Sequence, residues 1–368
     1  RARLSDAKFF FEEDMKRKLA DRVDDLKKVL FQKELGTTFE KTGRVVELAE
    51  FAAKAFYKDE TVTADSRRAA WLSKADLVTG MVGEFPNLQG IMGGEYARRS
   101  GEKEEVAAAV AEHYMPRFSG DDVPKTPAGT AVSVADKTDT IAGIFLAGKS
   151  PTGSEDPYAL RRQALGIIAI IYGGGFRVRL TELIRRAIEL LRVNEEKRPK
   201  LESEILDFFR QRVGNQLTAE GFEYDTVEAV LAREFDDIID ARERVVSLHA
   251  FRKAEGFAPF IIAYKRVANI IPEGFEGSVD EALLKEPAEK ELYAHYMEIK
   301  DEVSAMTEAG RYVDALERIS AVRPYVDRLF DAVMVMDKDE KIRANRLALM
   351  SGLAGMFRNI ADLRKIVV

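Results

Sequence analysis

The sequence predicts a mainly α-helical protein built from several domains. Apolar residues recur three and four positions apart along most of the chain, as on one face of a helix, and the alternation typical of strands is rare. The 368 residues exceed the usual domain size of about 100–200 residues. Since 46% of the residues are hydrophobic, the chain can bury several cores.

Residues 1–130 are predicted to form one helical domain. The apolar spacing favours helices over residues 9–31, 43–56, 66–82 and 102–114. Pro86 and the glycines between residues 90 and 94 interrupt the pattern. Residues 119–129 are rich in Gly, Asp and Pro, so we expect a loop there.

The residue pattern of the sequence changes after residue 130, which indicates a second region, residues 131–225. Residues 141–148 are interpreted as a buried strand or apolar segment, and a loop follows as far as residue 157. Helices are expected over residues 158–172, 180–193 and 201–213. The glycines at 173–175 lack the spacing of a phosphate-binding loop, so we interpret them as a turn between two helices.

The remaining residues, 226–368, are predicted to be helical again. Their apolar-spaced segments are separated by an acidic linker at residues 272–287 and by a charged turn at residues 337–340. The expected helices span residues 227–231, 238–250, 257–271, 289–309, 312–316, 325–335 and 342–363.

The most informative helix start lies at residues 156–162. Asp156 suits the N-cap because its carboxylate can accept from free backbone N–H groups, and Pro157 suits the first helical position. Arg161 and Arg162 then lie near the positive end of the helix dipole, where a cation is disfavoured by roughly 0.3–1 kcal/mol. We therefore expect these arginines to have anionic partners. Two alternatives stay open: carboxylates of the fold, or an external anion.

Composition excludes several classes of site. Cysteine is absent, which excludes disulfides and thiol chemistry and fits either a reducing cytoplasm, the location we expect, or a hot habitat. His113, His249 and His295 lie far apart and have no metal-ligand spacing, so we expect no metal site. No nucleotide-binding loop, Ser/His/Asp set or zinc-protease motif occurs, so we expect no catalytic residue. No apolar run is long enough to span a membrane.

Nucleic-acid binding by this chain has to depend on local basic patches, because the formal net charge is −6. Residues 177–200 hold eight Lys/Arg against four Asp/Glu, a local excess of positive charge. Such patches bind phosphates with a strong dependence on salt. The candidate RNA contacts in this part of the chain are Arg161, Arg162, Arg177, Arg179, Arg185 and Arg186.

Several segments match one known family in order from end to end. The most specific is PTGSEDPYALRR at residues 151–162. The others include LSDAKFFF at 4–11, SKADLVT at 73–79, MVGEFP at 81–86, KRVANI at 265–270 and NRLAL at 345–349. On these residues the chain resembles the bacterial glycyl-tRNA synthetase beta subunit, the large partner in the two-subunit enzyme. We expect it to correspond to the C-terminal half of that subunit.

The resemblance implies a fold for each region. Residues 1–130 would form an HD-like helical domain with a degenerate metal site. Lys74-Ala75-Asp76 stands where active HD hydrolases carry a His-Asp doublet, and lysine cannot act as a neutral imidazole ligand. Residues 131–225 would resemble the body and tail of CCA-adding enzymes, which hold tRNA. Residues 226–368 would resemble the helical-bundle anticodon-binding domain shared with arginyl-tRNA synthetase.

The resemblance also implies a function. The chain would be the tRNA-binding portion of a glycine–tRNA ligase, an ATP-dependent aminoacyl-tRNA synthetase, and would position glycine tRNA for aminoacylation by the alpha subunit. ATP and Mg²⁺ would bind at the alpha subunit, and this chain would hold no cofactor. Its partners would be glycine tRNA and the alpha subunit, in a hetero-oligomer without a membrane.

Two polar segments of the last region are candidates for reading bases. Lys265 and Asn269 lie one helical turn apart, beside Arg266. A second set, Arg343, Asn345 and Arg346, follows the charged turn. Amides next to cations can bond the edges of unstacked RNA bases. The alternative that Asn269 caps or bonds within the bundle stays open.

Two other functions remain as alternatives to tRNA binding. One is a metal-dependent HD phosphohydrolase, against which the missing histidine pairs argue. The other is a helical scaffold that binds only the alpha subunit. Salt-dependent binding of tRNA by the isolated chain would distinguish the leading hypothesis from the scaffold.

Overall fold

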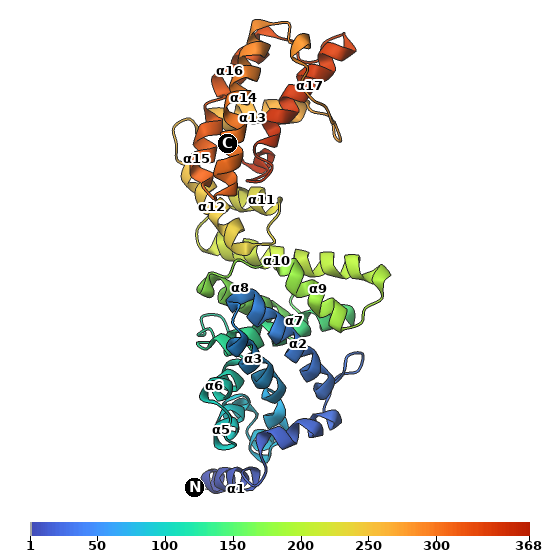
Figure 1. Cartoon of the computed structure of the whole chain (residues 1–368), viewed down its shortest axis with the longest axis vertical. Helices are drawn as coiled ribbons and strands as arrows, with labels where there is room; N and C mark the ends of the chain where they lie inside the picture. Colours follow the sequence, from blue (N-terminus) through green and yellow to red (C-terminus); the bar gives the residue numbers. More distant parts are fainter. Residues whose placement is uncertain (1) are drawn as a thin grey trace. The chain divides into compact units, whose positions relative to one another are not determined.

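The computed structural model of the chain describes residues 2–368. Contacts divide these residues into two compact units, one ending at Val213 and one spanning Gly214–Val368. Figure 1 shows the elements of both units coloured along the sequence. The described residues are mainly helical, with two short strands, which confirms the predicted mainly-α class. Among these residues, no helix has both the length and the apolar character needed to cross a membrane.

The first unit is an array of short and medium helices. Its α-helices are α1 (Ala2–Asp14), α2 (Thr38–Tyr57), α3 (Glu60–Leu72), α4 (Gly80–Glu84), α5 (Ile91–Arg99), α6 (Glu104–Glu112), α7 (Pro127–Leu146), α8 (Leu160–Gly174) and α9 (Leu180–Leu190). The 3-10 helices are η1 (Leu19–Lys28), η2 (Ala75–Val78), η3 (Pro86–Leu88) and η4 (Glu195–Lys197). Strands β1 (Leu30–Gln32) and β2 (Gly36–Thr37) pair in antiparallel fashion. Helix α10 (Arg198–Ala219) begins in this unit and crosses the boundary between the units.

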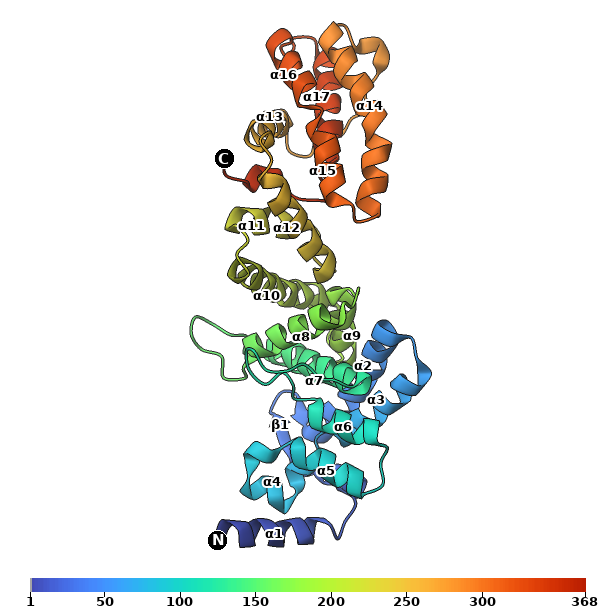
Figure 2. The same ribbon diagram turned by 90° about the vertical axis from the view of Figure 1, so that its left-hand side faces the viewer.

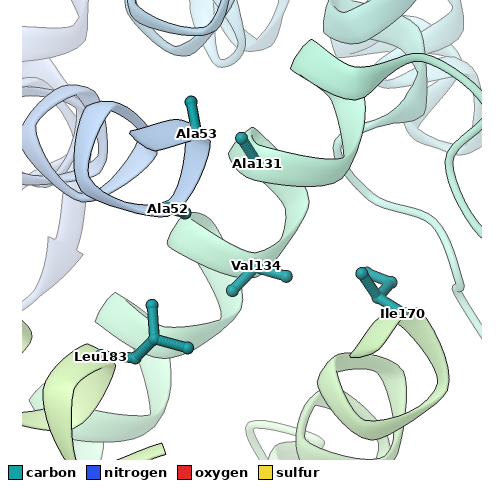
Figure 3. Packing of buried hydrophobic residues seen from close by; sticks show 6 residues of the cluster. All are labelled: Ala52, Ala53, Ala131, Val134, Ile170 and Leu183. Carbon is teal, nitrogen blue, oxygen red and sulfur yellow. The ribbon is translucent and has the colours of Figure 1, made fainter. Parts of the chain in front are cut away.

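Helix α7 forms the centre of the first unit. Every residue from Ala128 to Phe145 is buried, and α7 packs against α2, α3, α6, α8 and α9. Figure 3 shows Ala131 and Val134 of α7 between α2, which carries Ala52 and Ala53, and helices α8 and α9, which carry the labelled Ile170 and Leu183. This core joins the residues on both sides of the predicted boundary at 130/131 into one compact unit.

The central position of α7 decides between the two interpretations of residues 141–148, a buried strand or another apolar segment. Residues 141–146 belong to this helix and do not form a strand. The segment 141–146 is apolar on every side because other helices enclose α7, so it lacks the alternation of polar and apolar faces by which surface helices are recognised. The apolar run alone therefore could not distinguish a buried helix from a buried strand.

The helix predicted over residues 9–31 is divided into α1 and the 3-10 helix η1. Three of the four leucine and valine residues predicted to share an apolar stripe, Leu19, Val23 and Leu26, are fully buried. The fourth, Leu30, lies on β1 and is 65% exposed, so the stripe ends before it. The division occurs near Asp14, whose two carboxylate oxygens accept hydrogen bonds from the backbone N–H groups of Gly80 and Met81, each at 2.9 Å. Asp14 thus binds the start of α4, a partner 66 residues away that the local sequence does not reveal.

The loop before α8 confirms the capping role of Asp156 but moves the start of the helix. The Asp156 carboxylate accepts from the backbone N–H groups of Leu160 at 2.7 Å and Arg161 at 3.0 Å. The helix begins at Leu160, three residues after the expected position at Pro157. At its other end Gly175 adopts a left-handed conformation with φ 63°, which confirms the predicted turn between helices.

The second unit holds a second helical array. Its elements after α10 are α11 (Tyr224–Leu231), α12 (Ile238–Arg252), α13 (Phe257–Ile270), η5 (Glu281–Leu283), α14 (Pro287–Glu308), α15 (Tyr312–Ser320), α16 (Arg323–Ala332), α17 (Glu340–Gly355) and η6 (Leu363–Lys365). Helices α14, α16 and α17 lie together in Figure 2. The last predicted helix ends at Gly355, and the following segment returns to α11, where the Asp362 N–H donates to the carbonyl of Ala229 at 2.8 Å.

Candidate functional site

The first unit contains a cavity of about 620 Å³ whose wall is rich in cations. Five basic side chains and a single acidic one, Asp136, line it. The basic residues come from different parts of the fold and are Lys41 on α2, Lys74 before η2, Arg117 after α6, Lys137 on α7 and Arg162 on α8. We call this space the lysine cavity.

Lys74 lines the lysine cavity and is buried. Its Nζ lies 2.9 Å from Nε2 of His113 and 2.9 Å from Oδ2 of Asp136. The ring of Tyr114 covers the same ammonium, with its centroid 3.9 Å from Nζ, as in a cation–π contact. All three partners are separated from Lys74 by 39 or more residues in the sequence.

His113 is neutral in this arrangement. Its side chain is fully buried at the end of α6, and Nδ1 lies 2.7 Å from the carbonyl oxygen of Val110. Nδ1 therefore carries the proton and donates it, which leaves Nε2 to accept from Lys74. Burial, reinforced by the charge of Lys74, holds the pKa of His113 well below its usual range.

A second cluster of buried ion pairs lies beside Lys74, between α2 and α7. Lys41 donates to Thr140 Oγ1 at 2.8 Å and to Asp139 Oδ2 at 3.1 Å, and its Nζ lies 3.0 Å from Asp136 Oδ1. Arg44 binds Asp139 with two nitrogens, Nε at 2.6 Å and Nη2 at 3.2 Å. Burying these charges is tolerated because each has an opposite charge and hydrogen bonds.

Burial and neighbouring charges shift two pKa values in the cavity floor. Burial alone would raise the pKa of Asp136, but the ammonium groups of Lys41 and Lys74 hold it well below its usual range. Burial lowers the pKa of Lys137 to about 7, and Lys74 adds to this effect. Lys137 nevertheless donates to the carbonyl of Met115 at 2.8 Å and to Ser133 Oγ at 2.7 Å. The cavity thus holds a lysine that titrates near neutral pH.

The side chains of the lysine cavity do not fit a divalent metal ion. His113 and Asp136 are suitable ligand types, but the ammonium of Lys74 lies between them and occupies both donor atoms. Within residues 2–368, no three His, Cys, Asp or Glu side chains come together in a way that could hold a metal. We therefore derive no metal-dependent step at this place.

Asp76, the other polar residue of the Lys74-Ala75-Asp76 segment, holds the backbone at the start of α5. Its Oδ2 accepts from the backbone N–H groups of Gly90 at 2.6 Å and Gly93 at 3.1 Å, at the start of α5. A Cβ atom on Gly93 would lie 2.9 Å from this oxygen, so the glycine permits the approach. Burial raises the pKa of Asp76 to about 6, although these N–H groups and Lys74 oppose the shift.

The second unit contains a separate cavity of about 800 Å³ between α14 and the end of α17. Its wall combines the rings of Tyr293 and Tyr296 with the polar side chains of Lys300, Arg358 and Asn359. These last three make no side-chain hydrogen bond or ion pair within the described residues. We call this space the tyrosine cavity.

The close approach of α14 and α17 beside the tyrosine cavity depends on a glycine. A Cβ atom on Gly352 would lie 3.0 Å from the ring and hydroxyl of Tyr296. Burial raises the pKa of the Tyr296 hydroxyl, so it stays protonated and available as a donor at neutral pH.

The predicted arginines of the first unit have different environments. Arg161 donates to the carbonyl of Gly153 at 2.6 Å, whereas Arg162 is exposed and lines the lysine cavity. Arg185 pairs with Glu202 through two nitrogens, and Arg186 lies 3.4 Å from Glu47. Arg177 and Arg179 also have partners in the structure. For Arg162 alone among these six, no partner exists among the described residues.

On α13 the predicted base-reading residues are partly engaged. Lys265 donates to the carbonyl of Ile366 at 2.6 Å, and the guanidinium of Arg266 lies 4.5 Å from the ring centroid of Phe330. Asn269 is exposed, and its side chain makes no hydrogen bond within residues 2–368, so the capping alternative does not hold in this structure. Asn269 remains a candidate contact.

On α17 the structure corrects two candidates. Asn345 is buried and bonds both backbone groups of Asp280, accepting at 2.7 Å and donating at 3.0 Å. Arg346 is also buried, where it binds Glu289, Asp337 and a backbone carbonyl. Neither side chain is available to an RNA, and we remove both from the candidate set. Arg343 is partly exposed and donates to the carbonyl of Asp337.

Sequence reasoning missed most of the residues that line the two cavities. A weak signal existed for Lys137, because the charged and polar segment 136–140 lies between the apolar residues 131–135 and 141–146. No local pattern marked Arg117, Lys300, Arg358 or Asn359, which are gathered only by the packing of distant segments.

Comparison with known proteins gives matches along the whole chain. A family model described as glycyl-tRNA synthetase beta subunit matches residues 1–232, and a DALR anticodon binding domain model matches residues 260–367. Glycine–tRNA ligase beta subunits from Citrifermentans bemidjiense and Geobacter metallireducens are 46% and 48% identical to this chain over 368 residues. That from Clostridioides difficile is 44% identical over 367 residues. In all three, the match covers 100% of this chain and 53% of the relative, so the chain spans about half the length of these curated relatives.

Proposed function

The chain belongs to the glycyl-tRNA synthetase beta subunit family, and we propose that it is a tRNA-binding portion of such a subunit, which positions glycine tRNA for aminoacylation by an alpha subunit. The observation that carries the proposal is the match of residues 260–367 to an anticodon-binding domain. The proposal assigns ATP, Mg²⁺ and the chemical steps to the alpha subunit. It places the hetero-oligomer in the cytoplasm, with which the absence of cysteine is compatible.

The tyrosine cavity supports the anticodon-binding part of the proposal. Its lining residues, from Gly277 to Asn359, all lie within the matched segment. Single-stranded RNA is recognised by stacking unstacked bases on aromatic rings and bonding their edges, and Tyr293 and Tyr296 offer rings of this kind. Asn359 can donate and accept at a base edge, while Lys300 and Arg358 can pair with phosphates.

The test is a filter-binding titration of the chain against glycine tRNA and an anticodon-swapped variant at several salt concentrations. We expect glycine tRNA to bind more tightly than the swapped tRNA, and the affinity for both to fall with salt. Asn359→Ala should reduce the difference between the two tRNAs, by about 1–3 kcal/mol if a bidentate base contact is lost. Arg358→Gln should weaken binding of both tRNAs equally and flatten the salt slope.

Arg311→Gln provides a matched control for the titration. Arg311 belongs to the same unit and is exposed, and its Nη1 lies 3.5 Å from Asp314 outside the tyrosine cavity. It should bind both tRNAs like the wild type. If the chain bound neither tRNA, the proposal would be overturned in favour of a scaffold that binds only another protein. If Asn359→Ala and Arg358→Gln both kept the wild-type affinities, the assignment of the RNA contact to the tyrosine cavity would be overturned.

A further inference from the structure

The lysine cavity carries more positive charge than its own carboxylates neutralise. Lys41 and Lys74 share Asp136, and Asp139 is shared between Lys41 and Arg44. Lys137 binds only carbonyl and hydroxyl oxygens, so its charge, when present, has no carboxylate in direct contact. A low-dielectric floor with an excess of ammonium groups attracts an anion more strongly than an exposed patch does.

Two further cations lie in the wall of the cavity without partners. Arg117 and Arg162 both line it, and both side chains are exposed. Neither guanidinium makes a hydrogen bond or ion pair within the described part of the chain. A guanidinium group binds phosphate oxygens in a bidentate manner, and two of them beside one cavity suit a phosphate.

The remaining wall suits a planar, polar ring system. Phe31, Tyr114 and Tyr158 contribute aromatic rings. Asn87 and Gln89 contribute exposed side-chain amides that have no partner among the described residues. A volume of about 620 Å³ lies within the usual range of small-ligand pockets, roughly 300–1,000 Å³.

We propose that the lysine cavity is a nucleotide-binding site, in which Arg117 and Arg162 hold the phosphate and the aromatic and amide side chains hold the base. The site binds without hydrolysis, because the ammonium of Lys74 occupies the donor atoms that a catalytic metal would need. The ligand is a phosphorylated nucleotide, either free or as the terminal nucleotide of an RNA. This inference goes beyond the anticodon-binding role and stands on a different unit of the chain.

Lys137 gives the proposed site a pH dependence that supports the inference. Its pKa is about 7, since burial disfavours the ammonium form. A bound phosphate would stabilise that form and raise the pKa of Lys137. Binding should therefore weaken as the pH rises above 7, and in that range the complex should take up a proton as it forms.

The experiment is equilibrium dialysis of the 368-residue chain with radiolabelled AMP, with adenosine and inorganic phosphate as competitors. We expect saturable binding of AMP, displacement by phosphate, and at least about tenfold weaker competition by adenosine, which lacks the phosphate. The double variant R117Q/R162Q should bind AMP at least about tenfold more weakly and keep the wild-type melting temperature.

Arg210→Gln is the matched control for the double variant. Arg210 is exposed on α10 of the same unit, pairs with Asp207 at 2.9 Å and does not line the cavity. It should leave AMP binding unchanged. Absence of saturable AMP binding would overturn the proposal, and so would equal competition by adenosine and AMP, or unchanged affinity in the double variant.

A final competition identifies the source of the nucleotide. Glycine tRNA with its 3′-terminal nucleotide is compared with the same tRNA after removal of that nucleotide, each as a competitor of AMP. Stronger competition by the intact tRNA assigns the site to an RNA end. Absence of competition by both tRNAs assigns it to a free nucleotide. Equal competition by both would overturn the assignment to an RNA end, because the tRNA would then block AMP without its 3′-terminal nucleotide. None of these results depends on reading of the anticodon by the second unit.

Discussion

At the scale of single residues, the most consequential finding is the ammonium group of Lys74 between His113 and Asp136. The His113 imidazole and the Asp136 carboxylate each lie 2.9 Å from Nζ of Lys74, and together they hold its ammonium group. Lys41 adds a second ammonium at 3.0 Å from the same carboxylate. Asp136 is therefore the carboxylate that both buried ammonium groups share.

Asp136→Asn should be strongly destabilising. The substitution leaves the ammonium groups of Lys41 and Lys74 buried without this partner, and breaking a buried ion pair costs about 3–5 kcal/mol. Urea unfolding followed by circular dichroism measures the loss. Asp207→Asn, at an exposed carboxylate, should change the unfolding free energy by less than about 0.5 kcal/mol. A similar small change for Asp136→Asn would show that the cluster is not held as described.

Lys137 should make stability depend on pH above neutrality. Its pKa is lowered from 10.5 to about 7 in the folded state, mainly by burial. Between these two pH values the unfolded chain binds more protons than the folded chain, so the unfolding free energy rises with pH in that window. The difference in unfolding free energy between wild type and Lys137→Met should therefore shift in favour of the wild type from pH 7 to pH 10. A difference that is constant with pH would contradict the lowered pKa.

Asn269 and Asn345 should behave in opposite ways. Asn345→Ala should lower the unfolding free energy, because it removes the two hydrogen bonds between the buried Asn345 amide and the backbone of Asp280, each worth about 0.5–1.5 kcal/mol. Asn269→Ala should leave stability within about 0.5 kcal/mol of the wild type, since its exposed amide bonds nothing in the described chain. Thermal melts of both variants distinguish these roles, and a stable Asn345→Ala protein would restore Asn345 as a candidate RNA contact.

At the scale of elements, helix contacts in the first unit depend on glycines that admit a neighbouring backbone. A Cβ atom on Gly94 of α5 would lie 2.8 Å from the carbonyl oxygen of Ala107 on α6. A Cβ atom on Gly43 of α2 would have no neighbouring heavy atom within 4 Å. The two glycines are both helical, so their difference lies in packing alone.

Gly94→Ala should therefore destabilise the protein, by about 1–3 kcal/mol for an overpacked contact. Gly43→Ala should stabilise it by about 0.4–1 kcal/mol, because alanine loses less backbone entropy on folding. Chemical denaturation of the two variants against the wild type measures both signs. Changes of the same sign would mean that α5 and α6 do not approach as closely as the structure shows.

At the scale of the whole molecule, the proposed assignment of ATP and the chemical steps to an alpha subunit predicts what the chain does alone. In the lysine cavity the Lys74 ammonium occupies the donor atoms that a metal would need, and residues 260–367 match an anticodon-binding model. The isolated chain should show no ATP–pyrophosphate exchange with glycine and no phosphatase turnover with added Mn²⁺ or Mg²⁺. Turnover in either assay, from a preparation free of alpha subunit, would contradict the proposed role.

Local sequence patterns determined the helical class and the approximate order of the helices. They also determined the apolar stripe of Leu19, Val23 and Leu26 and the capping role of Asp156. All of these features depend on residues within one or two helical turns of each other. The family was recognisable from ordered motifs, above all residues 151–162. Only the tertiary structure decided that α7 is a helix, since a buried helix has no amphipathic period. It also decided which residues line the two cavities. Lys41, Lys74 and Asp136 come together although as many as 95 residues separate them in the sequence, and local periodicity carries no information about such distant partners.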